Sequence, residues 1–392
     1  MEAKHYRYLI VGGGMTADAA VTGIRTMDPL GSIALISEAP IPPYNRPPLS
    51  KGLWTGMYPD AIWRGTDRYL VDLHLGRKVV GLDPDARRVT DDQGDVYAYE
   101  KLLLATGCAP RRMGFGGDAI TYFRTLEDYE RLRHQTELGG RFAVIGAGFI
   151  GSEIAAALRM HGQDVTMLYP GSGIGGRVLP AELAEYIVDY FLRKGITMIG
   201  NERVNALEPR GAGVVLRAES GLEVEADHVV AGIGVIPNVK LAEMAGLETG
   251  NGILVDRFLR TARPEIHAAG DVAAFYTPLF DRHWRIEHED NSNHMGKTAG
   301  MNLAGANEPY DHLPYFDSEL FDLRYEAVGS LDSRLETVID WRKPFKQGVV
   351  YYLDAGRVKG VLTWNLPFKI GAARKLILEE GPFDSQNVIG RL

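Results

Sequence analysis

The segment that decides the fold is Tyr8-Leu9-Ile10-Val11-Gly12-Gly13-Gly14-Met15-Thr16-Ala17. An apolar run typical of a buried strand leads directly into a glycine-rich turn, and a helix-compatible segment follows. The arrangement returns 134 residues later, where Phe142-Ala143-Val144-Ile145 precedes Gly146-Ala147-Gly148-Phe149-Ile150-Gly151. In such turns the glycines let the backbone approach a pyrophosphate, and the following helix N-terminus favours its negative charge. The sequence therefore predicts two dinucleotide-binding sites.

Each turn opens a βαβ unit. The first has a strand over 6–11, a helix over 14–27 and a strand over 33–37, so that Glu38 stands 26 residues after Gly12 as an acceptor for ribose hydroxyls. The second has strands from Arg141 and over 165–169. Further expected elements are antiparallel strands at 213–219 and 223–227, strands at 348–353 and 358–365, and a helix at 371–380.

Three other strands end in turns of small residues that a cofactor can approach. They carry Ala105, Thr106 and Gly107, then Gly234, then Gly270 and Asp271. The carboxylate of Asp271 can accept bonds from sugar-type hydroxyls, and we expect a helix-compatible run to follow it.

These elements predict an α/β fold of two Rossmann-like, three-layer dinucleotide-binding domains, one inserted in the other, with a C-terminal α+β domain. Two dinucleotides in one chain usually mean a flavin and the nicotinamide that reduces it. The predicted boundaries are 1–121 with 246–314 for the FAD domain, 122–245 for the NAD(P)H domain and 315–392 for the C-terminal domain.

Composition narrows the function. The net charge of -8 argues against nucleic acid as a partner, because a phosphate backbone needs a dense basic face. A single cysteine, Cys108, rules out a redox-active cysteine pair and is expected to pack as a small apolar residue. No apolar stretch approaches the roughly 20 residues of a membrane span, and the early first strand leaves no room for a targeting peptide, so a cytoplasmic location is expected.

The chain resembles the apoptosis-inducing-factor family, which lies beside the ferredoxin and rubredoxin reductases of oxygenase systems. The resemblance runs almost end to end, and its C-terminal part favours the apoptosis-factor branch. The segments that carry it are Pro43–Lys51, Gly148–Glu153, Arg285-Ile286-Glu287-His288, Tyr325–Gly329, Gly348–Leu353 and Thr363-Trp364-Asn365.

The resemblance implies roles for several residues. Arg46 would contact the flavin cofactor, and Lys51, paired with Glu153, would lie near the flavin N5 and stabilise negative charge on the reduced ring. Phe149 would stack on the nicotinamide. Glu287 and His288 would lie where the nicotinamide meets the flavin, with His288 as a stacking and positioning residue.

Gly12, Gly14, Ala17 and Glu38 complete the expected FAD contacts, and Gly146, Gly148, Ile150 and Gly151 the NAD(P)H contacts. Residues 287–290 with His294 could suggest metal ligands, but the family has no metal here. A solvated helix start is expected instead.

Three departures from the family pattern stand out. The position of an aromatic over the flavin–nicotinamide pair aligns with Asp317, although a slip of one residue restores Phe316. The acidic ribose ligand that usually selects NADH is replaced by Gly171, while Arg177 lies close enough to accept a 2′-phosphate, so the coenzyme stays open. The long regulatory insert of the animal proteins is missing before Gly348.

Two functions are therefore expected. The first is an FAD-dependent NAD(P)H oxidoreductase, with a hydride passing to FAD and electrons to a ferredoxin-type iron–sulfur protein, a quinone or oxygen. The alternative is a slow redox sensor whose reduced, nicotinamide-bound form recruits a partner or forms a homodimer. Asp317 and the missing insert favour the enzyme.

Overall fold

The computed structural model describes residues 3–392, which divide into two compact units. The first contains the described residues up to 46, together with 58–109 and 236–314. The second contains 47–57, 110–235 and 315–392. The three-domain boundaries expected above stay a prediction. No helix in the described part of the chain is long and apolar enough to cross a membrane.

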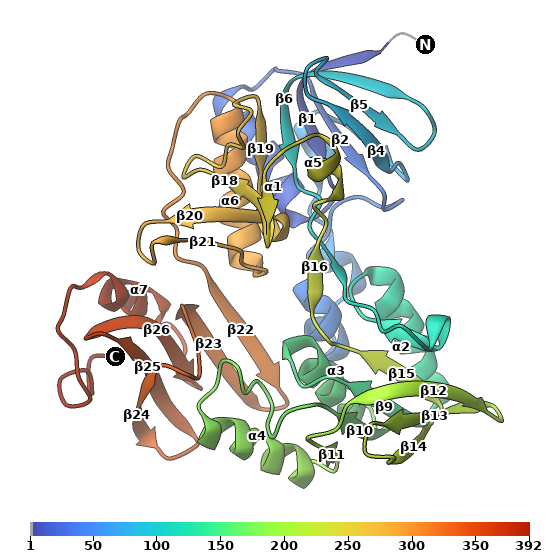
Figure 1. Cartoon of the computed structure of the whole chain (residues 1–392), viewed down its shortest axis with the longest axis vertical. Helices are drawn as coiled ribbons and strands as arrows, with labels where there is room; N and C mark the ends of the chain where they lie inside the picture. Colours follow the sequence, from blue (N-terminus) through green and yellow to red (C-terminus); the bar gives the residue numbers. More distant parts are fainter. Residues whose placement is uncertain (1–2) are drawn as a thin grey trace. The chain divides into compact units, whose positions relative to one another are not determined.

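The first unit is built on a seven-stranded sheet in the order β3-β2-β1-β6-β5-β4, with β19 beside β6 (Figure 1). Strands β3, β2, β1, β6 and β19 run parallel, as consecutive βαβ crossovers require. Strands β4 and β5 add an antiparallel edge. The bounds are β1 (Lys4–Val11), β2 (Ile33–Ser37), β3 (Val71–Leu75), β4 (Val79–Asp83), β5 (Arg88–Asp91), β6 (Val96–Leu104) and β19 (Ile266–Ala268).

Helices α1 (Met15–Met27) and α6 (Glu289–Leu303) pack against each other in this unit. Glycines allow the close approach: a Cβ on Gly23 would lie 2.1 Å from the carbonyl oxygen of Lys297, and one on Gly300 would lie 2.1 Å from that of Ala20. The unit also holds α5 (Lys240–Met244) and a smaller sheet of β17 (Thr249–Gly250), β18 (Gly252–Val255), β20 (Ala273–Thr277) and β21 (Arg282–Trp284).

One expectation for this unit is wrong. The segment after Asp271 is not a helix but a three-residue 3-10 turn, Gly270–Val272, followed directly by β20. The residues 273–275 pair with β18 in parallel, and this pairing decides their conformation over local helical preference.

The second unit contains a five-stranded parallel sheet in the order β11-β10-β9-β15-β8. Its strands are β8 (Ile120–Tyr122), β9 (Arg141–Ile145), β10 (Asp164–Leu168), β11 (Thr197–Ile199) and β15 (His228–Ala231). The accompanying helices are α2 (Leu126–Leu138), α3 (Phe149–Met160) and α4 (Ala181–Arg193). Beside the parallel sheet lie the antiparallel strands β12 (Val204–Arg210), β13 (Gly213–Ala218) and β14 (Glu223–Ala226), so the predicted antiparallel pair is confirmed.

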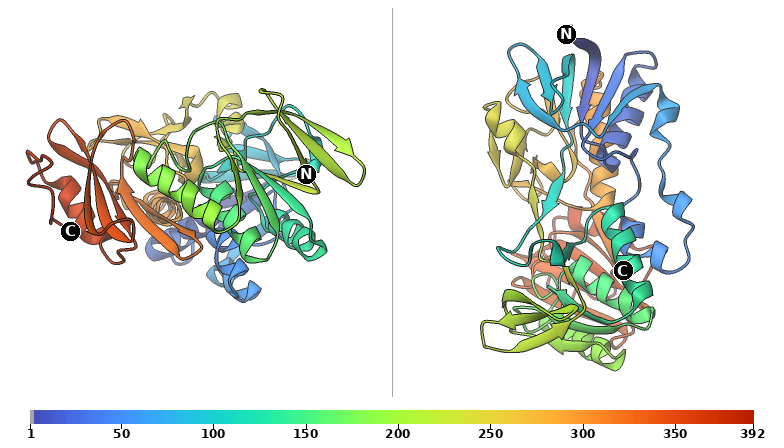
Figure 2. Two further views of the ribbon diagram at one scale, coloured as in Figure 1. Left: turned by 90° about the horizontal axis from the view of Figure 1, so that it is seen from below. Right: turned by 90° about the vertical axis from the view of Figure 1, so that its right-hand side faces the viewer.

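The C-terminal segment of this unit forms an antiparallel sheet in the order β22-β23-β26-β25-β24, against which helix α7 (Ile370–Leu378) lies (Figure 2). Its strands are β22 (Tyr315–Leu320), β23 (Leu323–Gly329), β24 (Glu336–Lys343), β25 (Gln347–Asp354) and β26 (Arg357–Trp364). The predicted strands and terminal helix of this segment are confirmed.

The short strands β7 (Cys108–Pro110) and β16 (Val235–Pro237) pair with each other.

Candidate cofactor sites

The first glycine turn has the geometry that a flavin dinucleotide needs. Gly12 follows β1 with φ of 130°, and a Cβ there would lie 2.1 Å from the carbonyl oxygen of Ala105. Gly14 is the N-cap of α1, and no side chain caps the helix. Gly14 lies beside Arg46, because a Cβ on Gly14 would be 3.8 Å from Arg46 Nη2. The helix start is thus open to an anion, with the predicted arginine next to it.

The other residues expected around FAD gather at the same edge. Ala105 follows β6, and its amide donates to the Val11 carbonyl at 2.8 Å. Gly270 follows β19 with φ of 78°, and a Cβ there would lie 2.2 Å from Thr16 Oγ1 in α1. Since parallel strands bind ligands at their carboxyl ends, these residues fit an FAD site of the expected kind.

Several side chains of this set have defined surroundings. Asp271 is 9 % exposed and its Oδ1 accepts from Ser292 Oγ at 3.3 Å. Thr106 Oγ1 donates to the Asn238 carbonyl at 2.9 Å, and Ala17 is fully buried. Glu38 lies at the carboxyl end of β2 and forms a surface ion pair with Lys78 at 2.9 Å. Its role as a ribose acceptor stays a prediction.

Arg285 is a residue of this region that sequence reasoning did not assign. Its Nη1 donates to the Asp271 carbonyl at 3.1 Å and to Cys108 Sγ at 3.2 Å, and its Nη2 lies 2.7 Å from Glu287 Oε1. Cys108 is buried as expected, but it has this guanidinium as a neighbour rather than a purely apolar environment. Arg285 therefore ties the Asp271 turn to the segment of Glu287 and His288, which is the N-cap of α6.

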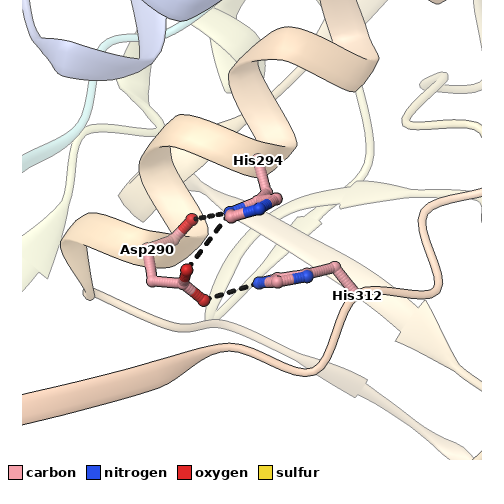
Figure 3. A group of neighbouring side chains, drawn as sticks. All are labelled: Asp290, His294 and His312. Carbon is pink, nitrogen blue, oxygen red and sulfur yellow. Dashed lines mark hydrogen bonds and ion pairs between the residues drawn. The ribbon is translucent and has the colours of Figure 1, made fainter. Parts of the chain in front are cut away.

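The acidic and histidine cluster at the start of α6 is joined by a residue from outside it, His312 (Figure 3). His312 Nε2 lies 2.5 Å from Asp290 Oδ2, and His294 Nδ1 lies 3.2 Å from Asp290 Oδ1. The two imidazole rings stack at 3.7 Å with an interplanar angle of 11°. The Asp290 carboxylate thus lies between the two imidazoles, and one potential ligand atom from each of the three residues lies within 4.8 Å of the others.

The expected solvated helix start is found in part, because Glu287, Glu289 and His294 are exposed, whereas the Asp290 side chain is only 10 % exposed.

The second glycine turn has the same design in the second unit. Gly146 has φ of 104°, and a Cβ there would lie 2.5 Å from the Gly232 carbonyl oxygen. A Cβ on Gly151 would lie 2.2 Å from the Gly146 carbonyl oxygen. Helix α3 begins at Phe149 with Gly148 as an N-cap and no capping side chain. Ile150 lies in the first turn of α3 and is 40 % exposed. Gly234 follows β15, and a Cβ added there would meet no atom within 4 Å. The turn fits a second dinucleotide.

Lys51 and Glu153 form the expected pair in the second unit, with Nζ 3.8 Å from Oε1, and their side chains are 15 % and 4 % exposed. Glu153 accepts hydrogen bonds from Ser50 Oγ at 2.6 Å and from Ser318 Oγ at 2.8 Å. Burial raises the pKa of Glu153 above its ordinary value, although Lys51 and the two hydroxyls oppose the shift. For Lys51 burial acts to lower the pKa, but the carboxylates of Glu153 and Asp317 outweigh it and the pKa rises. Lys51 is therefore held as a cation.

Asp317 supplies the second carboxylate on Lys51. Its Oδ2 and its carbonyl oxygen each accept from Lys51 Nζ at 3.0 Å. Its neighbour Phe316 points to the other side of β22, and its ring lies 4.8 Å from that of Phe149. The contacts therefore favour the alignment shifted by one residue. In that alignment Phe316 takes the position of the family's aromatic residue, and Asp317 pairs with Lys51.

The comparisons with known proteins agree with this geometry. The family model described as pyridine nucleotide-disulphide oxidoreductase matches residues 6–296. The model for the C-terminal domain of mitochondrion-associated apoptosis-inducing factor matches 299–345. The ferredoxin–NAD(+) reductase component of an anthranilate 1,2-dioxygenase system from Burkholderia cepacia is 36 % identical, over 97 % of this chain and 96 % of its own.

Two solved structures resemble the whole chain. The ferredoxin reductase for the CYP199A2 system from Rhodopseudomonas palustris has a TM-score of 0.90 at 30 % identity, covering 98 % of this chain and all of its own. A covalent putidaredoxin reductase–putidaredoxin complex has a TM-score of 0.89 at 30 % identity, covering 96 % and 93 %. The chain belongs to the pyridine nucleotide-disulphide oxidoreductase family, and it is an FAD-dependent oxidoreductase that uses NAD(P)H.

Proposed function

We propose that this oxidoreductase passes its electrons to a small iron–sulfur protein of the ferredoxin type. The observation that carries the proposal is the end-to-end similarity, described above, to ferredoxin reductases and to a putidaredoxin reductase solved in covalent complex with putidaredoxin. The chain itself supports an external acceptor. Its one cysteine, Cys108, cannot form an intramolecular disulfide to receive electrons.

The chain's residues bind and orient the reactants in this scheme. FAD, when bound, accepts a hydride and releases electrons singly. The turns at Gly12 and Gly146 would hold the two pyrophosphates, and the aromatic pair of Phe149 and Phe316 would position the nicotinamide. Lys51, kept charged by its two carboxylates, would stabilise negative charge on the reduced flavin. Hydride transfer then gains from positioning, because the reaction becomes effectively unimolecular.

The redox-sensor alternative is supported by the match to the apoptosis-inducing-factor C-terminal model. The structure of that segment speaks against a loop-release switch. Strands β24 and β25 form a hairpin in which residues 344–346 alone separate Lys343 from Gln347. This short connection contains no long regulatory insert, so we rank the redox-sensor function below the ferredoxin reductase function.

The two proposed functions predict different steady-state kinetics and different oligomeric states of the reduced protein. With saturating NAD(P)H, we expect reduction of a [2Fe–2S] ferredoxin to exceed reduction of oxygen by at least about tenfold, a difference of about 1.4 kcal/mol in barrier. A quinone or oxygen acceptor at equal or higher rate would contradict the proposal. Size-exclusion chromatography with and without the reduced coenzyme tests the sensor, since a shift to a homodimer on reduction would favour it. The cytoplasmic location stays a prediction.

A further inference from the structure

The two dinucleotide folds of this chain can be compared strand by strand. In the first, Val11 pairs with Ile36, and Glu38 follows two residues later. In the second, Ile145 pairs with Leu168, and the residue two positions later is Pro170. Since Gly12 and Gly146 directly follow Val11 and Ile145, Pro170 occupies the place that Glu38 has in the first fold. Gly171, the position that the family resemblance gives to the acidic residue, comes directly after it.

The loop after β10 contains no carboxylate to take over that role. From Tyr169 to Pro180 it has neither aspartate nor glutamate, and its one charged residue is Arg177. A carboxylate at the end of this strand binds the ribose hydroxyls of NADH and repels the 2′-phosphate of NADPH, whereas an arginine nearby accommodates that phosphate. The charges on this loop, one arginine and no carboxylate, are therefore those that favour NADPH over NADH.

Backbone contacts bring Arg177 towards the second glycine turn. The Gly175 amide donates to the Ala147 carbonyl at 3.0 Å, and Ala147 lies within the turn itself. The backbone next to Arg177 is fixed from the other side. The Ser333 amide donates to the Arg177 carbonyl at 3.0 Å, and Ser333 Oγ donates to the Gly176 carbonyl at 2.7 Å.

The Arg177 side chain is exposed, and within residues 3–392 it makes no hydrogen bond or ion pair. It is thus available to a bound anion.

A carboxylate on the neighbouring loop, Glu202, is directed elsewhere. Its amide donates to the Tyr169 carbonyl at 3.0 Å, but its Oε2 accepts from Ser220 Oγ at 2.8 Å, in the turn between β13 and β14. Arg203, next to it, is also exposed. The charged groups on the two loops are thus two arginines and one carboxylate that already has a partner.

We propose that the loop over residues 170–177 selects NADPH over NADH, with Arg177 binding the 2′-phosphate. The inference rests on the proposed function and adds the coenzyme to it. A charge-assisted bond between guanidinium and phosphate contributes about 1.5–3 kcal/mol, which corresponds to roughly a tenfold to hundredfold preference.

The test uses the holoprotein and four substitutions, of which two are controls. Arg177→Gln removes the cation, and Arg203→Gln is its matched control on the neighbouring loop. Gly171→Glu installs a ribose acceptor at a position where a Cβ meets no atom within 4 Å, and Gly171→Gln controls for size. Flavin reduction is followed by stopped flow with each coenzyme, so no protein acceptor is needed.

For the unaltered protein we expect kcat/KM for NADPH to exceed that for NADH by about tenfold or more. Arg177→Gln should lower the NADPH value about tenfold through KM, while the NADH value changes less than about twofold. Gly171→Glu should reverse the preference. An equal or NADH-favouring wild type, an equal loss on both coenzymes, or a loss from Arg203→Gln instead of Arg177→Gln would overturn the proposal.

A binding measurement separates this inference from the proposed function. Calorimetric titration of the oxidised holoprotein with 2′,5′-ADP and with 5′-AMP requires no electron transfer. We expect tighter binding of the 2′-phosphorylated fragment and loss of that difference in Arg177→Gln. Equal affinities for the two fragments would refute the phosphate site even if ferredoxin reduction succeeds, and a retained difference would leave it standing if ferredoxin reduction fails.

Discussion

Replacing Lys51 by methionine should destabilise the second unit strongly, because it leaves two carboxylates without their shared cation. Lys51 Nζ lies 3.0 Å from Asp317 Oδ2 and 3.8 Å from Glu153 Oε1, and its side chain is only 15 % exposed. Methionine preserves most of the side-chain volume, so the change is mainly one of charge.

The magnitude follows from the distances. At an effective dielectric constant of about 20 the two ion pairs have Coulomb energies of roughly 5 and 4 kcal/mol. Removing one partner of a buried pair typically costs about 3–5 kcal/mol. We expect the lower value, about 3 kcal/mol, because Asp317 is 26 % exposed and has Arg324 Nη2 at 3.9 Å.

The loss should also depend on pH. Burial raises the pKa of Glu153, and removing Lys51 raises it further because Lys51 acts to lower it. The folded variant therefore binds a proton that the unfolded chain, with its ordinary glutamate pKa, does not. Its stability deficit should shrink as the pH falls towards that raised pKa.

The assay is urea unfolding of the holoprotein in excess FAD, followed by circular dichroism. The control is Lys78→Met, which breaks the exposed ion pair with Glu38 at 2.9 Å, where less than about 1 kcal/mol is at stake. A loss below about 1 kcal/mol in Lys51→Met, or one that does not change with pH, would refute the reasoning.

Three further outcomes are expected. His267 is 2 % exposed, neither ring nitrogen has a hydrogen-bond partner among the described residues, and burial lowers its pKa to about 3. Between pH 7 and pH 5 the free energy of unfolding should therefore fall by about 2 kcal/mol more in the unaltered protein than in His267→Leu. Urea unfolding that gives both proteins the same pH dependence would contradict this. Gly146→Ala should raise KM for the reduced coenzyme at least about tenfold with flavin still bound, because the new Cβ would lie 2.5 Å from a carbonyl oxygen. Dialysis against a chelator should leave activity and melting temperature unchanged, and a loss that one metal ion reverses would contradict this and make Asp290, His294 and His312 the candidate ligands.

Much of the fold could be predicted because its signals are local. The glycine turns at Gly12 and Gly146 fix where a strand ends and a helix begins, and the apolar runs before them give the strands. The segment after Asp271 could not be assigned this way. Its composition suits a helix, and its pairing with β18 and β21 makes it a strand.

The contacts around the site were less predictable, because they join residues far apart in the sequence. Lys51 and Asp317 are separated by 266 residues, and Cys108 and Arg285 by 177. A one-residue uncertainty in aligning β22 exchanges Phe316 and Asp317 between opposite faces of the strand. Only the three-dimensional structure shows that the aromatic ring meets Phe149 and the carboxylate meets Lys51.

The central claim, electron flow from NAD(P)H through FAD to an iron–sulfur protein, is tested most directly by an anaerobic titration of the purified holoprotein. We predict that a stoichiometric amount of NADPH bleaches the flavin absorbance and that oxidised [2Fe–2S] ferredoxin restores it promptly. A flavin that neither NADPH nor NADH bleaches, or a reduced form with a long-wavelength band that persists after ferredoxin and air are added, would contradict the account.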